Sequence, residues 1–217
     1  MFLRFYVFAL AVLTAISSSI ICFSTPLVGY LCPSCSSASN PSQLIENINE
    51  YYSTVNIAFI VWDENDGSIV NEFNNPSKKF YLTPSMISDL QSQGRDVFVS
   101  IGGGAGPTLD CSNNANSDWI NTFTQGILNV TSTYGFNGVD FDIEHRTGDY
   151  VQCAYLVQKV MNVLSSKGLK LSIAPQMPNL YPDLSTVGAG FNELAPLISI
   201  VCFFSHCRSL RTTFACV

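Results

Sequence analysis

The 217-residue sequence has few basic residues and few charges of either sign. Lysine and arginine together number 10, against 16 aspartates and glutamates, for a formal net charge of −6. A nucleic-acid-binding protein normally presents a basic face to phosphates, so this balance argues against that class. Only 12% of the residues are charged, whereas 47% are hydrophobic and 12% are aromatic. This composition predicts a packed core and excludes a disordered chain.

Beyond residue 23, the sequence lacks any apolar run that could span a membrane. The first residues contain a short basic start (Met1–Arg4), an apolar run (residues 5–16) and three serines (residues 17–19). This order is typical of a secretory signal peptide, which we assign to residues 1–24, with cleavage near Ser24 or after the three serines. The alternative is a membrane anchor, since residues 5–23 approach the ~20 residues needed to cross a bilayer. We therefore expect a secreted, extracellular protein with no membrane association after cleavage.

Eight cysteines in an exported chain favour disulfides over metal-bound thiolates. Cys32 and Cys35 form a C-x-x-C pair, which we interpret as a local structural disulfide rather than a redox site. Cys111 and Cys153 lie in or near two predicted loops, and a disulfide between them is one pairing that their positions allow. Residues 129–131 form the single N-glycosylation sequon, as expected of a secreted glycoprotein.

The remainder of the chain alternates strand-like apolar runs with helical patterns, without a low-complexity linker. The predicted strands cover residues 27–30, 55–61, 97–101, 138–144, 169–174 and 197–204. The predicted helices cover residues 41–52, 84–94 after a Thr83 cap, 118–134 with Asp118 as the cap, and 149–167. Such alternation predicts a parallel α/β fold, either an open sheet or a (β/α)8 barrel, and periodicity alone does not separate the two.

The fourth predicted strand, residues 138–144, carries three carboxylates on one face. Alternate side chains of a strand share a face, so Asp140, Asp142 and Glu144 point the same way, about 6.6 Å apart in succession. Three like charges inside an apolar parallel sheet require either shared protons and hydrogen bonds or a bound cation. Glu144 falls at the carboxyl end of the strand, where parallel α/β folds gather their reactive groups.

Three interpretations of this row compete. A metal site needs oxygen ligands from several segments, and no further set of ligating side chains stands out, so we expect neither a metal nor another cofactor. A solvated edge strand conflicts with the flanking apolar alternation. General acid chemistry fits best, because crowded carboxylates raise one another's pKa and keep the outermost one protonated. The glycine-rich stretch at residues 102–106 matches neither G-x-G-x-x-G nor the P-loop, so nucleotide binding is not expected.

Two motifs resemble the signatures of glycoside hydrolase family 18, the chitinases and chitinase-like lectins. Residues 137–144, N-G-V-D-F-D-I-E, resemble D-G-x-D-x-D-x-E, and residues 100–103, S-I-G-G, resemble S-x-G-G on the preceding strand. The sequence D-F-D-I-E at residues 140–144 and the sequence A-P-Q at residues 174–176 are most similar to the single-domain class III, hevamine-like branch. The resemblance implies a (β/α)8 TIM barrel, incomplete here with about six of its eight strands.

The resemblance also implies a role for individual residues. Glu144 would protonate the glycosidic oxygen, and Asp142 would hold the N-acetyl group whose carbonyl oxygen attacks the anomeric carbon. This substrate-assisted, retaining route hydrolyses β-1,4-linked N-acetylglucosamine polymers, so chitin or its oligosaccharides would be the binding partner. Asp140 would set the charge of Asp142 together with Ser100. The residues expected to bind substrate are Ser100, Gly102, Gly103, Gln176 and Met177.

The sequence departs from the family pattern in two places. Asn137 stands where the signature has its first Asp, from which we expect an altered proton network and a shifted pH optimum. After residue 201 no tyrosine follows, and no tryptophan appears after Trp119, although the class III branch carries a tyrosine on its sixth strand and a tryptophan on its eighth.

We therefore hypothesise a truncated member, with a partial catalytic barrel over residues 25–204 and a divergent tail over residues 205–217. A full-length relative is expected to be a monomer, whereas the truncated chain is expected to aggregate or dimerise through its open sheet edges. The alternatives to a chitinase are a non-catalytic, lectin-like chitin-binding protein and an inactive fragment.

Overall fold

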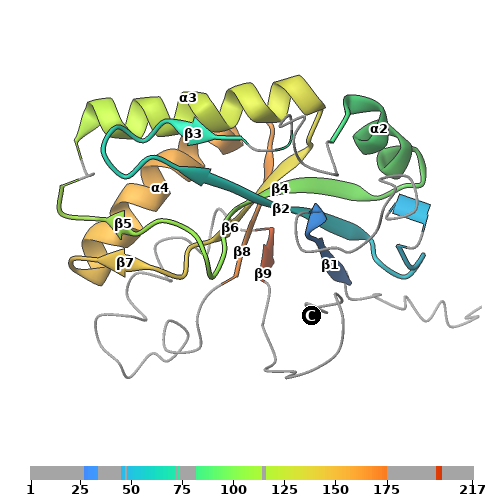
Figure 1. Ribbon diagram of the computed structural model, residues 1–217, viewed down its shortest axis with the longest axis horizontal. Helices are drawn as coiled ribbons and strands as arrows, with labels where there is room; N and C mark the ends of the chain where they lie inside the picture. The colour runs from blue at the N-terminus through green and yellow to red at the C-terminus, as the bar shows by residue number, and fades with distance from the viewer. Residues whose placement is uncertain are drawn as a thin grey trace, which may run out of the picture.

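The computed structural model describes residues 27–33, 45–46, 48–71, 73, 82–113, 116–174 and 199–201. Its main feature is a seven-stranded sheet, in which six parallel strands follow the order β1-β2-β4-β6-β8-β9 (Figure 1). These strands are β1 (Val28–Leu31), β2 (Thr54–Trp62), β4 (Asp96–Gly102), β6 (Gly138–Asp142), β8 (Lys170–Ile173) and β9 (Ile200–Val201). A short strand, β3 (Ile69–Val70), pairs antiparallel with β2, and β5 (Leu109–Asp110) pairs with β7 (Arg146–Thr147) in a separate ribbon.

The order of the strands decides between the two predicted folds. In a doubly wound sheet the strand order reverses at a switch point and helices cover both faces. Here the parallel strands follow one another in chain order, and the helices pack on one face. This is the arrangement of a (β/α) barrel, seen over the strands that the structure describes.

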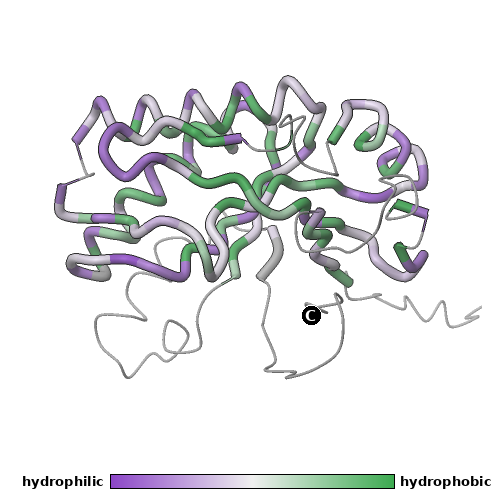
Figure 2. Tube along the Cα trace, in the orientation of Figure 1, coloured by the Kyte–Doolittle hydropathy of each residue, from purple (hydrophilic) through white to green (hydrophobic). Residues whose placement is uncertain are grey.

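One apolar cluster joins the sheet to helices α2 (Pro84–Ser92), α3 (Ser117–Tyr134) and α4 (Tyr150–Ser166). Its fully buried members include Val97 and Val99 of β4, Ile87 of α2, Ile127 of α3 and Val160 of α4. Figure 2 shows this pattern, with hydrophobic residues along the central strands and hydrophilic residues on the turns between elements. Because the helices cover this face of the sheet, the opposite face lines the barrel interior.

The alternation of β6 places its side chains on two different surfaces. Val139 and Phe141 belong to the cluster under the helices, whereas Asp140 and Asp142 point to the barrel interior and are also buried. The register with the neighbouring strands then sets what those acids meet. Ser100 of β4 pairs with Asp140, and Ser172 of β8 pairs with the same residue from the other side.

The six predicted parallel strands are confirmed, the first five within two residues of their predicted bounds. The bounds predicted for the sixth, 197 and 204, lie outside the described residues. Two of the predicted helices, after Thr83 and from Asp149, are confirmed. Thr83 is the cap as predicted, whereas Asp149, predicted as the first helical residue, is itself the cap. The helix before Tyr134 is confirmed, but its cap is wrong: the Asn116 side chain accepts from the Trp119 amide, and Asp118 lies in the first turn. Asn and Asp are about equally good caps, so the sequence did not distinguish them, and the helix begins directly after Asn116, whose side chain is placed to accept from its first turn.

Two other boundaries were predicted incorrectly. Within the predicted helix at residues 41–52, only Ile45 and Glu46 of the described residues are helical, and residues 48–52 form turns that lead into β2. The fourth strand ends at Asp142, so Glu144 stands on the loop beyond it rather than within it. The short strands β3, β5 and β7 were not predicted, because two-residue pairings leave no periodic signal.

A disulfide joins Cys111 to Cys153, as the sequence allowed, with their Cα atoms 4.9 Å apart. Cys32 is also disulfide-bonded. In the part of the chain that the structure describes, no helix combines the length and the apolar character needed to cross a bilayer. The predicted signal peptide, the tail at residues 205–217, Gln176 and Met177 lie outside the described residues.

Candidate active site

Asp140 lies at the centre of a hydroxyl cage inside the sheet and is fully buried. Its Oδ2 accepts hydrogen bonds from the Tyr30 hydroxyl at 2.7 Å and from the Ser100 hydroxyl at 2.6 Å. Its Oδ1 accepts from the Ser172 hydroxyl. Burial raises the pKa of Asp140, and the three hydroxyl donors oppose that rise. Four parallel strands thus hold one carboxyl in a single orientation.

Asp142 is the next inward-facing acid on β6 and is 2% exposed. Burial, then the negative charges of Asp140 and Glu144, raises the pKa of Asp142 to about 8. Its Oδ1 has no hydrogen-bond partner among the described residues. A buried carboxyl that is protonated at neutral pH and has an unoccupied oxygen can bind a polar group of a ligand.

Glu144 follows β6 and is only partly buried, so it is the acid of the row that solvent reaches. The glycines at the end of β4 lie against the backbone of this region. Gly102 has φ +108°, and a Cβ there would lie 2.3 Å from the Asp142 carbonyl oxygen. The Gly103 amide donates to that same oxygen at 2.8 Å. Gly102 is required because the ends of β4 and β6 approach too closely for a side chain, whereas a Cβ at Gly103, where φ is +83°, would lie 2.8 Å from the Phe59 ring.

The structure therefore brings together six of the predicted site residues at the carboxyl ends of β4 and β6. They are Ser100, Gly102, Gly103, Asp140, Asp142 and Glu144. Gln176 and Met177, the other two, lie outside the described residues. Among the described residues, no group of three or more His, Cys, Asp or Glu side chains has an arrangement that would hold a metal ion.

Sequence reasoning missed four residues around the acids. Tyr30 and Ser172 complete the cage of Asp140, and His145 follows Glu144 directly. Asn56 of β2 is fully buried and slightly lowers the pKa of Asp140, although its amide makes no regular hydrogen bond with any described residue. The inward alternation of Val28 and Tyr30 on β1 was a usable signal for Tyr30, whereas Ser172 depends on a register that only the assembled sheet defines.

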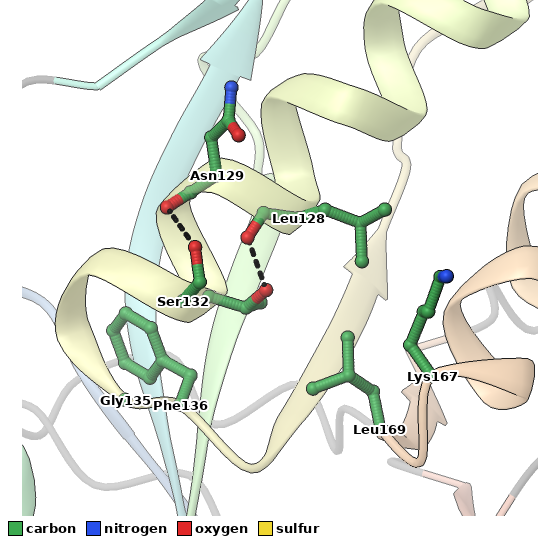
Figure 3. A pocket seen from close by; sticks show the side chains of 8 residues that line it. Leu128, Asn129, Ser132, Gly135, Phe136, Lys167 and Leu169 are labelled. Carbon is green, nitrogen blue, oxygen red and sulfur yellow. Dashed lines mark hydrogen bonds between the residues drawn. The ribbon is translucent and has the colours of Figure 1, made fainter.

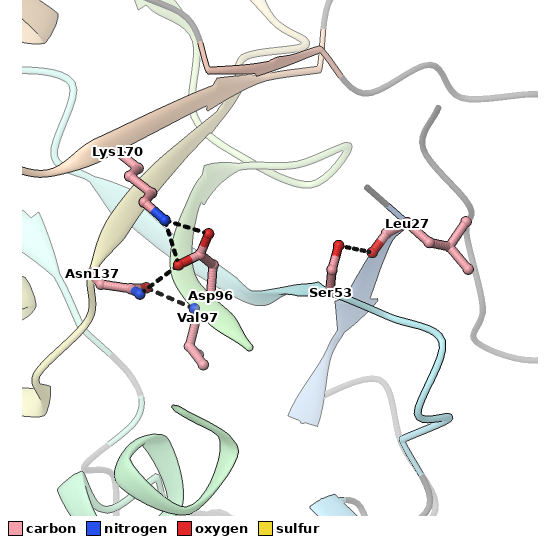
Figure 4. A network of polar contacts seen from close by, with 6 residues as sticks. All are labelled: Leu27, Ser53, Asp96, Val97, Asn137 and Lys170. Atoms are coloured by element: carbon pink, nitrogen blue, oxygen red, sulfur yellow. Dashed lines mark hydrogen bonds and ion pairs between the residues drawn. The ribbon is translucent and has the colours of Figure 1, made fainter. Parts of the chain in front are cut away.

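Asn137, from which an altered proton network is expected, hydrogen-bonds at the start of β4 rather than to the acids. Its Oδ1 accepts from the Val97 amide at 2.7 Å, and its Nδ2 donates to Asp96 Oδ1 at 2.8 Å. Lys170 forms an ion pair with Asp96 at 2.7 Å, so three strand starts are joined by one polar network (Figure 4). This network lies at the amino ends of the strands, whereas the acids approach the carboxyl ends. Asn137 therefore has a structural role in strand alignment.

A surface pocket of about 480 Å³ lies between the end of α3 and the start of β8, away from the acids (Figure 3). Apolar Leu128, Phe136 and Leu169 line it together with Lys167 and the exposed end of α3. It contains no acidic side chain. The acid row, rather than this pocket, is the candidate site.

Fold and site together define a parallel barrel-type protein with buried acids at the carboxyl ends of its strands, the location of active sites in barrel enzymes. The chain belongs to glycosyl hydrolases family 18, whose sequence model matches residues 27–202. The predicted family and the (β/α)8 type of fold are thereby confirmed, and the described residues form six of its parallel strands.

Individual relatives agree with this assignment. Chitinase Chi52 of Paenibacillus xylanexedens is 31% identical over 71% of this chain and 31% of its own length. An acidic endochitinase of Nicotiana tabacum is 31% identical over 64% of this chain and 50% of its own length. The crystal structure of a family 18 chitinase from Chromobacterium violaceum superposes with a TM-score of 0.65 at 19% identity, covering 88% of this chain and 55% of that one. The chain thus spans from 31% to 50% of the length of these two relatives.

Proposed function

We propose that residues 25–204 form the catalytic part of a chitinase, which hydrolyses β-1,4-linked N-acetylglucosamine polymers with retention of configuration. The observation that carries this proposal is Asp142, a buried acid with a pKa of about 8 and an unoccupied oxygen, between a caged acid and a solvent-accessible one. The substrate class is supported by the chitinases among the relatives of this chain.

Each acid has its own part in the proposed reaction. Glu144 donates its proton to the glycosidic oxygen while the bond from that oxygen to the anomeric carbon breaks. The carbonyl oxygen of the substrate's own N-acetyl group forms a bond to the same carbon, so the protein supplies no nucleophile. Water then opens the cyclic intermediate and returns a proton to Glu144, which regenerates the acid.

Asp142 positions and polarises the N-acetyl group in this scheme. A neutral carboxyl at this position can hydrogen-bond the amide, and it can ionise once a positive charge develops on the cyclising group. Asp140 holds Asp142 in this state through its charge, and the hydroxyl donors of Tyr30 and Ser100 keep Asp140 in place. Gly102 and Gly103 let the end of β4 lie close to the acid-bearing segment, and we propose that Gln176 and Met177 complete the sugar site.

We propose further that the protein is secreted. The Cys111–Cys153 disulfide supports this location, because disulfides persist in oxidising compartments. Asn129 of the sequon is exposed on α3, as a glycosylated asparagine must be.

The test is hydrolysis of a fluorogenic N-acetyl-chitooligosaccharide by the full chain beside Glu144→Gln and Asp142→Asn. Glu50→Gln, an exposed isosteric change away from the site, is the matched control and should retain wild-type turnover. We expect Glu144→Gln to lose at least about a hundredfold in kcat, the contribution typical of a general acid. Binding without turnover in the wild-type chain would favour a lectin-like protein, and neither binding nor turnover would indicate an inactive fragment.

A further inference from the structure

The loop after β4 and the loop after β6 are fastened together beside Glu144. The ribbon of β5 and β7 joins them through the pairs Leu109–Arg146 and Asp110–Thr147. The Cys111–Cys153 disulfide lies immediately beyond that ribbon. At the other end, the Gly103 amide donates to the Asp142 carbonyl at 2.8 Å. Both ends of the glycine-rich loop are therefore held against the segment that carries the acid.

The middle of this loop lies directly on the Glu144 carboxylate. A Cβ added at Gly104 would lie 3.4 Å from both carboxylate oxygens, so the backbone itself forms one wall of the acid's surroundings. Gly106 donates to the Gly103 carbonyl at 2.8 Å, which closes the loop into a tight turn. A shift of this turn would change the position and the hydration of Glu144.

His145 joins the middle of the loop to the acid-bearing segment. Its Nε2 lies 3.0 Å from the Gly104 carbonyl oxygen, and because that oxygen only accepts, Nε2 carries the hydrogen. Its own carbonyl accepts from the Leu109 amide at 2.9 Å. One residue, adjacent to the acid in sequence, thus contacts the loop at two points.

We propose that His145 is a positioning residue for the reaction: its imidazole fixes the Gly103–Gly106 turn against Glu144 and so sets the orientation of the acid toward the glycosidic oxygen. This inference rests on the proposed function of Glu144. It assigns to His145 no contact with substrate and no proton transfer. Its effect should fall on kcat rather than on KM, because the contact acts on the acid and not on the bound sugar.

The experiment compares His145→Ala, His145→Gln and His145→Asn in the full chain. The Gln amide nitrogen can occupy the position of Nε2 and donate to Gly104, whereas the shorter Asn amide does not reach it. We expect His145→Ala and His145→Asn to lower kcat about tenfold to a hundredfold, the range that a misplacement of about 1 Å produces, with KM changed less than about twofold. His145→Gln should recover most of the loss.

A second measurement does not depend on activity. Amide hydrogen exchange should be faster at Gly103 and Gly106 in His145→Ala, unchanged in the interior of β4 and β6, and restored in His145→Gln. An inactive wild-type chain would refute the proposed function. The exchange measurement would still show whether His145 holds the Gly103–Gly106 turn. Unchanged exchange, a melting temperature that falls with kcat intact, or a Gln variant no better than Ala would overturn the role of His145.

Discussion

The raised pKa of Asp142 makes a prediction about stability that needs no substrate. In the folded chain this pKa is about 8, against an ordinary value of 3.8. Between these two values the folded state binds the proton and the unfolded state does not. The free energy of unfolding therefore falls as the pH rises through this window, by about 1.4 kcal/mol per pH unit for one such group.

Replacement of Asp142 by Asn should remove this penalty. Asn has the same shape and stays neutral, so it resembles the protonated acid at every pH. We compare the free energy of unfolding of Asp142→Asn with that of the wild type at each pH. As the pH rises from 5 to 7, we expect this difference to grow by about 2 to 3 kcal/mol in favour of the variant. Below about pH 3 the two proteins should differ little on this account, because the carboxyl is then protonated in both states.

Urea unfolding followed by circular dichroism between pH 4 and pH 9 measures this difference, with the disulfides kept oxidised. Asp140 contributes a dependence of the same sign, but it is present in both proteins and largely cancels from their difference. Glu50→Gln serves as the control, because it makes the same type of substitution at an exposed position away from the acids. Parallel curves for Asp142→Asn and wild type across this range would refute the reasoning about burial and charge at this position.

Two further predictions concern the scaffold. Asn137→Asp should lower the free energy of unfolding by about 1 to 3 kcal/mol, because a second carboxylate would face Asp96 and the amide donor would be lost. Adding Asp96→Asn to the same chain should recover part of the lost stability. The pH–rate profile should stay unchanged, and a shift in it would reinstate a link between Asn137 and the acids. Replacing Cys111 and Cys153 together by Ser should lower stability by about 2 to 4 kcal/mol, since the bridge closes a loop with a sequence separation of 42. With reductant, which also opens the disulfide of Cys32 in both proteins, the double variant and the wild type should melt at the same temperature. Equal melting of the two oxidised proteins would contradict a stabilising role.

Much of the fold was predictable because its signals are local. The apolar run of β2 and the cap at Thr83 can be read from adjacent residues, and they lie where expected. The row of acids on β6 was equally predictable, since alternation along a strand needs no knowledge of its neighbours. The prediction failed where two local signals competed, as at Asn116 and Asp118, or where a pairing spans only two residues.

The surroundings of the acids could not be predicted in the same way. Nothing in the spacing of Ser172 distinguishes it from any other strand serine until β8 is placed beside β6. The same holds for Asn137, which the motif alone associated with the proton network. Its neighbours turned out to be Asp96 and Lys170, which come from two other strands.

The sequence by itself determined the class of this protein: two motifs, an alternating acid row and a strand–helix order that together specify a family 18 barrel. Tertiary structure alone decided the chemical state of the acids. The pKa of a carboxyl depends on how far it is removed from water and on which charges and donors surround it, and these come from residues distant in the chain. It also decided that His145, unremarked in the sequence, holds the loop over Glu144, because that contact exists only when β4 and β6 lie side by side.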